Sequence, residues 1–262
     1  IAFKCVTDVV ESGASVVVDP DRIISRIPSD FALPPGGLNI RWPDGILEQE
    51  ARLLDWKVYA ALAYVRANGL DRIVWNSPAG STPARLGIVT TGKSFGDTMQ
   101  ALADLGIDET VARDIGLRVY KVAMSWPLEP QGARRFAQGL EEILVVEEKR
   151  QLIEYQIKEE LYSWEAGVRA PRVVGKFDDN GEWSRAEGQP AGTWLLPAHY
   201  EHNPAIVAKA IAQRLLKLNM ASALGSRFRE RLAYLEFKEK ALARPRVTSI
   251  RQPYFCSGCP HN

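Results

Sequence analysis

Residues 86–91 (LGIVTT) form a short apolar run rich in β-branched residues, and three similar runs follow it along the chain. Stretches with helical spacing of apolar residues separate these runs. The runs are 86–91, 118–124 (RVYKVAM), 142–148 (EILVVEE) and 172–177 (RVVGKF), and the helical stretches are 94–106, 130–140 and 151–164. Nearly continuous apolar strands that alternate with helices are typical of a parallel sheet covered on both faces. The sequence therefore predicts an α/β fold, with a mostly parallel sheet covered by helices and right-handed crossovers between the strands.

The segment before this alternation predicts extended chain followed by one long helix. Residues 3–10 and 14–19 read as two short strands, and the stretch 30–45, rich in Pro and Gly, reads as an extended connector. Apolar residues then recur at three and four positions across 47–68, which predicts a helix that ends at Gly69. The α/β region is thus expected to be flanked by a connector and a linker helix.

Further elements are predicted on both sides of the central alternation. Residues 71–76 (DRIVWN) predict a strand, and Asn180-Gly181 within DDNGEW predicts a hairpin-type turn. Asn203 and Pro204 are typical of the N-cap and the first position of a helix. Residues 220–243 predict a long amphipathic linker helix that stops before Pro245.

The composition excludes several classes of protein. The chain has 262 residues, 46% of them hydrophobic, and a formal net charge of +1 from 33 basic and 32 acidic residues. This charge balance does not indicate binding to nucleic acid or to an anionic membrane. No apolar run approaches the roughly 20 residues that a membrane-spanning helix needs. Three cysteines do not make a secreted disulfide framework, so we expect a cytoplasmic protein. Cys5 lies in an apolar stretch and is expected to be an unreactive buried thiol.

Residues 87–94 (GIVTTGKS) fit the letters of a phosphate-binding loop, G-x-x-x-x-G-K-[ST]. The context argues against that function, because β-forming residues stand where an irregular loop is needed. The alternative interpretation makes Gly92 a strand-to-helix turn and makes Ser94 with Asp97 a capping box for the next helix. Nucleotide binding through Lys93 remains the weaker hypothesis.

A second charged motif lies at the end of a predicted strand. Residues 147–150 (EEKR) follow the apolar run of 142–146, at the edge where sheets of this kind place functional groups. A run of two acids and two bases is nevertheless more typical of solvated or inter-domain ion pairs, and that is the role we expect.

The strongest chemical signal is the pair Cys256 and Cys259, with Gly258 between them allowing a tight turn. Two thiolates at this spacing can bind one metal centre. Haem attachment requires His directly after the second Cys, but Pro260 intervenes before His261. The residues alone leave zinc and an iron–sulfur cluster as alternatives, and either needs ligands in addition to this pair. Because the chain begins at Ile1 and stops close to this motif, we expect it to be an internal segment of a longer protein.

The order of several segments resembles indolepyruvate ferredoxin oxidoreductase, a member of the thiamine-diphosphate-dependent 2-oxoacid:ferredoxin oxidoreductases. The segments that carry the resemblance are 4–16 (KCVTDVVESGASV), 34–44 (PPGGLNIRWPD), 84–97 (ARLGIVTTGKSFGD), 119–130 (VYKVAMSWPLEP), 142–162 (EILVVEEKRQLIEYQIKEELY) and 253–262 (PYFCSGCPHN). They occur in order and span nearly the whole chain.

The resemblance implies a division of the chain into five parts. Residues 1–45 would be the tail of an upstream pyrimidine-binding domain with its connector, and 46–83 a linking helix and strand. Residues 84–218 would be a transketolase C-terminal-like α/β domain, followed by a linker helix at 219–244. Residues 245–262 would open a diphosphate-binding domain that contains the cysteine pair.

The resemblance also implies the chemistry. Cys256 and Cys259 would ligate a [4Fe-4S] cluster, and His261 would be a candidate cofactor-binding residue. Thiamine diphosphate with Mg²⁺ would bind mostly outside this chain, with coenzyme A as co-substrate and ferredoxin as electron acceptor. The expected activity is oxidative decarboxylation of an aryl pyruvate such as indolepyruvate to an acyl-CoA, together with other domains or subunits of the same enzyme. No catalytic residue is expected within the chain itself, and a non-catalytic α/β module with structural zinc at the cysteine pair is the alternative.

Overall fold

A five-stranded sheet forms the centre of the computed structural model, which describes residues 15, 17–22, 24–39, 44–76, 82–165, 167–183 and 191–242. The strand order is β1-β3-β2-β4-β5. The strands are β1 (Arg72–Trp75), β2 (Leu86–Thr91), β3 (Leu117–Val122), β4 (Glu142–Val146) and β5 (Arg172–Val174). β2, β3, β4 and β5 are parallel, whereas β1 pairs antiparallel with β3 at one edge. The predicted α/β fold with a mostly parallel sheet is confirmed, and the predicted strand at 71–76 is the antiparallel edge strand.

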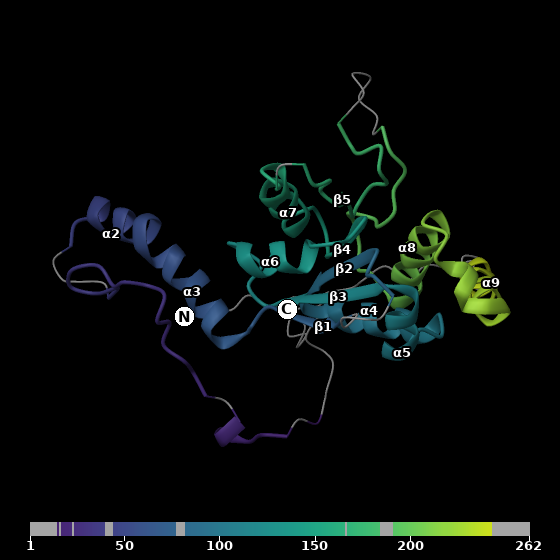
Figure 1. The fold of residues 1–262 in the computed structure, drawn as a ribbon, viewed down its shortest axis with the longest axis horizontal. Helices are drawn as coiled ribbons and strands as arrows, with labels where there is room; N and C mark the ends of the chain where they lie inside the picture. The colour runs from purple at the N-terminus through teal and green to yellow at the C-terminus, as the bar shows by residue number, and fades with distance from the viewer. Residues whose placement is uncertain are drawn as a thin grey trace, which may run out of the picture.

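Helices cover both faces of the sheet, as Figure 1 shows. On one face lie α4 (Gly92–Asp104), α5 (Glu109–Ile115) and α8 (Pro204–Lys217), and on the other lie α6 (Pro130–Ala137) and α7 (Ile153–Tyr162). Successive side chains of a strand point to opposite faces. Ile88 therefore packs in the α4 and α8 core, whereas Val89 packs in the α6 and α7 core. Burial on both faces explains why the strands are apolar at nearly every position.

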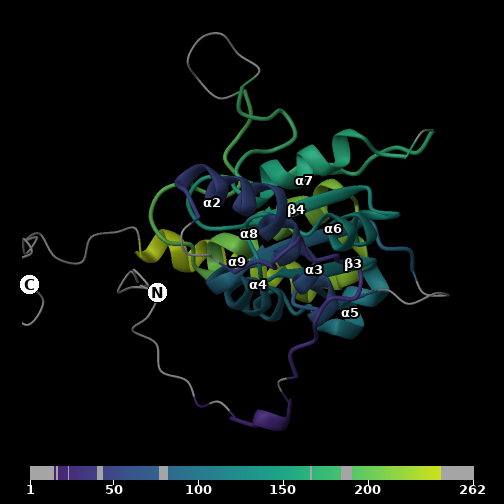
Figure 2. The same cartoon turned by 90° about the vertical axis from the view of Figure 1, so that its left-hand side faces the viewer.

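A long helix and a connector precede the sheet. α2 (Ile46–Arg52), a π-helical segment η2 (Leu53–Lys57) and α3 (Val58–Asn68) follow one another, and the helix ends at Gly69 in a left-handed conformation, as predicted. Figure 1 shows this helix projecting from the sheet domain, and in Figure 2 the helix lies in front of that domain. Residues 24–39 contain no helix or strand and run back beside α3, where Asn68 and Arg26 exchange two hydrogen bonds of 2.7 and 2.9 Å. The predicted extended connector is thus confirmed over its described part.

The start of α4 differs from the sequence expectation. Gly92 has φ of 52° and makes the predicted strand-to-helix turn, but the helix begins at Gly92 rather than Ser94. Ser94 consequently lies inside the first turn, where its buried hydroxyl has no hydrogen-bond partner in the described part of the chain, and Asp97 pairs with Lys93 instead. The predicted capping box of Ser94 and Asp97 is therefore wrong.

Three other elements were predicted incorrectly or missed. Residues 15 and 17–19, the described part of the predicted strand 14–19, form no strand, and the short 3-10 helix η1 (Pro20–Arg22) follows them. Residues 3–10, the other predicted strand, lie outside the described residues. The seven-residue helix α5, capped by Asp108, was not predicted. The predicted helix 220–243 is interrupted at Gly225, which has φ of 67° and separates the 3-10 helix η3 (Ala221–Leu224) from α9 (Gly225–Leu242).

The segment between β5 and α8 folds back on itself. The turn predicted at Asn180-Gly181 is present, with the Gly181 amide donating to the Asp178 carbonyl at 3.1 Å. The chain returns at 191–196, where Phe177 bridges Trp194 in antiparallel fashion. Asn203 then caps α8 by accepting from the Ile206 amide at 3.0 Å, and Pro204 occupies the first helical position, as predicted. None of the described helices combines the length and apolar character needed to span a membrane.

Candidate functional site at the carboxyl edge of the sheet

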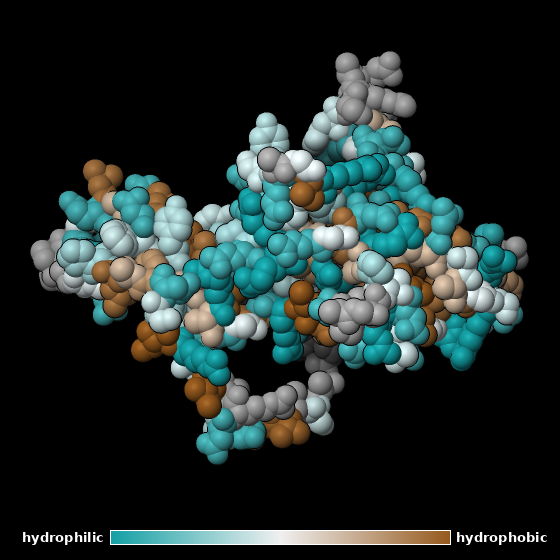
Figure 3. All heavy atoms as spheres, viewed as in Figure 1, coloured by the Kyte–Doolittle hydropathy of each residue, from teal (hydrophilic) through white to brown (hydrophobic). Residues whose placement is uncertain are grey.

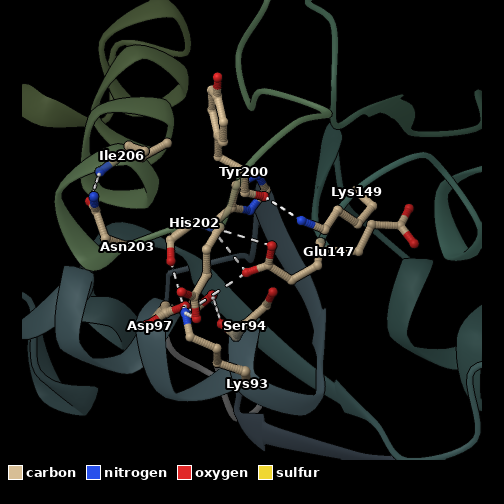
Figure 4. A network of polar contacts seen from close by, with 12 residues as sticks. Lys93, Ser94, Asp97, Glu147, Lys149, Tyr200, His202, Asn203 and Ile206 are labelled. Carbon is tan, nitrogen blue, oxygen red and sulfur yellow. Dashed lines mark hydrogen bonds and ion pairs between the residues drawn. The ribbon is translucent and has the colours of Figure 1, made fainter. Parts of the chain in front are cut away.

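Ligands of open α/β sheets bind beyond the carboxyl ends of the parallel strands. In this chain that edge carries a network of charged side chains, shown in Figure 4. Lys93 follows β2, Glu147 and Glu148 follow β4, and Lys176 follows β5, while His202 comes from the loop before α8. The parallel strands bring together residues that are more than 100 positions apart in sequence, such as Lys93 and His202.

Lys93 is fully engaged by its own chain. Its ammonium group donates to Asp97 at 2.7 Å and to the His202 carbonyl at 2.8 Å, and it pairs with Glu201 at 3.2 Å and Glu148 at 3.8 Å. Burial alone would lower the pKa of Lys93, but the nearby carboxylates of Asp97 and Glu201 outweigh it and raise the pKa. These contacts hold the loop before α8 against the start of α4.

Most of the residues that match the letters of a phosphate-binding loop form a strand. Residues 88–91, which such a motif would place in an irregular loop, form β2, the central strand of the sheet. A side chain at Gly87 would come within 2.6 Å of Phe136 and 2.5 Å of Leu140, so this glycine serves close packing under α6. The structure thus bears out the strand that the β-forming residues of the motif predicted.

The charged residues 147–150 make internal contacts. The Glu147 carboxylate accepts from the backbone amides of Leu152, Ile153 and Glu154 at 2.9 to 3.0 Å and so caps α7. Glu148 accepts from the His202 amide at 3.2 Å. Lys149 donates to the Tyr200 carbonyl, and Arg150 pairs with Glu182 at 2.7 Å. The expected ion-pair role thus holds for Arg150, whereas Glu147 acts as a buried helix cap, which the sequence did not predict.

Lys176 is the most deeply buried cation of this network, with 1% of its surface exposed. Its ammonium group donates to the Glu147 carbonyl at 2.5 Å and lies 3.5 Å from Nε2 of His202, which in turn lies 2.8 Å from the Pro197 carbonyl. Burial lowers the pKa of Lys176 to about 8, although Glu147, Glu148 and Glu154 oppose this shift. Burial also lowers the pKa of His202 below its ordinary value. Lys176 therefore fastens the loop before α8 to the ends of β4 and β5.

This burial predicts a pH-dependent stability. Below pH 8 Lys176 is protonated in both the folded and the unfolded chain, and above that value the folded chain releases the proton first. The unfolded state then binds more protons, so the contribution of Lys176 to stability rises from about pH 8 to about 10.5. The change in the pKa of Lys176 from 10.5 to about 8 on folding corresponds to at most about 3 kcal/mol of folding stability.

A Lys176→Met variant, which cannot titrate, isolates this effect. We expect the wild-type chain to gain about 1 to 3 kcal/mol relative to the variant between pH 7.5 and 10.5, measured by urea denaturation at each pH. His202 is mostly neutral in the unfolded chain across this range, because the ordinary pKa of histidine is about 6.5, and burial lowers its pKa further in the folded chain. A difference between the two proteins that stays constant with pH would contradict the assignment of a lowered pKa to Lys176.

The candidate metal and cofactor residues lie elsewhere in the chain. Cys256, Cys259 and His261 are outside the described residues. Across the part of the chain that the structure describes, no group of three or more His, Cys, Asp and Glu side chains is arranged to hold a metal ion. Lys176 and His202 were not predicted from the sequence, and the available signal was a lysine that follows the apolar residues of β5.

The carboxyl edge is thus an internally paired network that closes an α/β domain. Comparison with known proteins gives the family. The model of the indolepyruvate ferredoxin oxidoreductase middle domain matches residues 76–245. The chain therefore belongs to the indolepyruvate ferredoxin oxidoreductase family.

Curated relatives agree with this family. The chain is 26% identical over 192 residues to indolepyruvate oxidoreductase subunit IorA of Thermococcus kodakarensis, and 27% identical over 190 residues to the IorA subunit of Pyrococcus abyssi. These matches cover 73% and 71% of the chain and 24% of each relative. The chain thus spans about a quarter of the length of these curated relatives.

Solved structures give weaker similarities. A 2-oxoglutarate:ferredoxin oxidoreductase from Magnetococcus marinus is 13% identical with a TM-score of 0.32, covering 65% of this chain and 24% of that one. A split-gene transketolase, an inactive β4 tetramer, is 16% identical with a TM-score of 0.35, covering 56% of this chain and 41% of that one. Similarities of this size do not define a shared fold, so the fold class follows from the sheet topology, and the transketolase-like domain remains a prediction.

Proposed function

We propose that the chain is the central part of an enzyme that oxidatively decarboxylates an aryl 2-oxoacid, such as indolepyruvate, to its acyl-CoA and transfers the electrons to ferredoxin. The observation that carries this proposal is the family match over residues 76–245, and the IorA relatives support it. In the reaction the bond between the keto carbon and the carboxylate breaks, and a bond from that carbon to the coenzyme A sulfur forms. One 2-oxoacid anion and one thiol give one thioester, carbon dioxide and a proton, while two ferredoxin centres each gain one electron.

The cofactors belong to the same proposal. Bound thiamine diphosphate with Mg²⁺ would supply the electron sink for decarboxylation, and a [4Fe-4S] cluster would take the electrons singly. Cys256 and Cys259 are the candidate cluster ligands, and His261 is a candidate cofactor contact. Thiolate ligation suits a reducing cytoplasm.

Within this enzyme we assign the described domain an architectural role and no catalytic residue. Lys93, Glu147, Glu148 and Lys176 hold the segments after β2, β4 and β5 together with the loop before α8. A network whose charged side chains are already paired is suited to fixing loop positions, because changing a partner would leave a buried charge unpaired. The domain would hold the upstream and downstream domains of the polypeptide at a fixed spacing.

The test uses the full-length polypeptide, purified without oxygen together with any partner subunit. We expect a brown protein that reduces ferredoxin when given indolepyruvate and coenzyme A. Cys256→Ala should remove the broad visible absorption of the cluster and the ferredoxin reduction. The matched control Cys5→Ala should leave both unchanged.

Two results would overturn the proposal. A colourless protein that contains zinc in proportion to protein, and loses it in Cys256→Ala, would establish the structural zinc module instead. A brown protein that reduces ferredoxin with none of indolepyruvate, phenylpyruvate and pyruvate would exclude the proposed reaction.

A further inference from the structure

A cavity of about 260 Å³ lies beside the edge of the sheet, where the end of α3, the start of β1, β3 and α6 meet. Figure 1 shows α3 reaching the sheet domain next to α6. Tyr120 lines the cavity from the carboxyl half of β3. Asp71, also part of the lining, accepts from the amides of Ala123 and Met124, which directly follow β3. The cavity therefore lies at the edge where open α/β sheets bind their ligands.

Two buried polar atoms of the residues that line this cavity have no partner in the described part of the chain. Tyr120 is 2% exposed, yet its hydroxyl forms no hydrogen bond with a described residue. One carboxylate oxygen of Asp71 accepts from the two backbone amides, whereas the other is buried and accepts from no described group. Buried polar groups are almost always paired, so two unpaired groups around one cavity indicate a polar occupant.

Gly132 keeps the space next to the Tyr120 hydroxyl open. A side-chain carbon at Gly132 would lie 2.5 Å from that hydroxyl and 2.8 Å from a carboxylate oxygen of Glu129. Glu129 is already engaged as the cap of α6 and in an ion pair of 3.2 Å with Arg66. Burial and the nearby charges of Asp71 and Glu129 raise the pKa of Tyr120, so its hydroxyl stays protonated and can donate a hydrogen bond.

Two arginines at the same cavity carry charges that the described chain does not neutralise. Arg72 of β1 and Arg135 of α6 are exposed, and neither guanidinium group makes an ion pair or a hydrogen bond with a described residue. Arg135 is close enough to Tyr120 for its charge to oppose the rise in the tyrosine pKa. Figure 3 shows hydrophilic residues gathered over α6, the helix of Arg135. The cavity thus offers two guanidinium groups at its rim and a free carboxylate oxygen inside.

These opposite charges describe the chemistry of the occupant. A guanidinium group can bind a carboxylate through two parallel hydrogen bonds. Burial raises the pKa of Asp71, and an ammonium group beside its free oxygen would stabilise the charged form of that carboxyl group. A ligand that complements both ends therefore carries a carboxylate and an ammonium group on one small skeleton.

We propose that this cavity binds an α-amino acid with a short apolar side chain. The carboxylate of the ligand pairs with Arg72 and Arg135 and accepts from the Tyr120 hydroxyl. The ammonium group of the ligand donates to the free oxygen of Asp71. The apolar side chain of the ligand contacts Val65 and Ile73, which belong to the same lining.

Isothermal titration calorimetry of the full-length polypeptide tests this proposal. The probes are L-valine and two compounds that each lack one of its charged groups, 3-methylbutanoate and isobutylamine. We expect one L-valine site per polypeptide, with an affinity at least tenfold higher than that for either single-charge compound, because each of those leaves one end of the cavity unpaired.

Three variants connect the binding to this cavity. Arg135→Gln and Asp71→Asn should each weaken the binding of L-valine at least tenfold. Asn at position 71 retains a side-chain oxygen for the two backbone amides, and Arg135 is exposed, so both variants should remain folded. Arg229→Gln, at an exposed arginine of α9, is the matched control and should leave the affinity unchanged.

Three results would overturn the proposal. If none of the three compounds binds, water alone satisfies the free polar atoms of the cavity. Equal affinities for L-valine and 3-methylbutanoate would show that Asp71 contacts no ammonium group. Unchanged binding in Arg135→Gln would place the valine site elsewhere on the polypeptide. Calorimetry requires no turnover, so each result is independent of whether the polypeptide carries out the proposed reaction.

Discussion

Replacing Glu142 by glutamine is expected to lower the free energy of unfolding by about 3 kcal/mol or more. Glu142 opens β4 and lies against Arg214 of α8, with two hydrogen bonds of 2.6 and 2.5 Å between the carboxylate and the guanidinium group. The two side chains are 2% and 3% exposed. Removing the charge of Glu142 leaves the buried guanidinium group of Arg214 with only the longer contact of 3.4 Å to Asp179, and that poorly compensated charge is the main cost.

The preceding residue provides a matched control. Glu141 pairs with Arg85 at 2.5 Å, but those side chains are 51% and 37% exposed. Solvent screens such a pair, so Glu141→Gln should change the free energy of unfolding by less than about 1 kcal/mol. Urea denaturation of the 262-residue chain at pH 7, followed by circular dichroism, measures both variants. Equal losses at the two positions would contradict the proposed difference in burial.

Gly116→Ala is expected to cost about 3 kcal/mol or more. Gly116 ends α5 with φ of 79°, a conformation that costs an L-residue about 1 kcal/mol. A methyl group there would also lie 2.4 Å from the Pro83 carbonyl oxygen. Backbone must then move at the entry to β2, where the Gly116 carbonyl accepts from the amides of Arg85 and Leu86 at 2.8 and 3.3 Å. Overpacking of this kind typically adds 1–3 kcal/mol to the conformational cost.

Gly139→Ala separates these two contributions. Gly139 has φ of 77°, yet a side chain there would meet nothing within 4 Å. We expect this variant to lose only the conformational part, about 1 kcal/mol. Thermal and urea unfolding of both variants would show the difference. If Gly139→Ala were as destabilising as Gly116→Ala, the contact with Pro83 would not be the cause.

Three elements of the fold differ from the sequence prediction for specific physical reasons. The helix α5 has seven residues, too few for a periodic pattern, although Asp108 and Gly116 stand where a cap and a stop are expected. The capping box at Ser94 failed because Gly92 adopts a positive φ and starts the helix two residues earlier. Gly225 also adopts a positive φ, and it divides the predicted helix 220–243 into η3 and α9.

Only some residues of the candidate sites could be predicted from the sequence. Cys256 and Cys259 were found because metal ligation demands a short, recognisable spacing. Lys176 and His202 were not found, because their 26 residues of separation show no pattern and their contact arises where a loop crosses the ends of two strands. Glu147 was assigned to a charged run, whereas its burial as the cap of α7 depends on the turn that follows β4.

The sequence by itself determined the α/β class, the alternation of β2, β3, β4 and β5 with α4, α6 and α7, and the family, because apolar periodicity and short motifs are local properties of the chain. Only the tertiary structure decided the strand order β1-β3-β2-β4-β5, the antiparallel edge strand and the pairing of Glu142 with Arg214. It also decided which charges are buried, such as Lys176, and which apolar residues remain open, such as Leu54. Burial depends on which distant segments pack together, and packing is a property of the whole fold rather than of neighbouring residues.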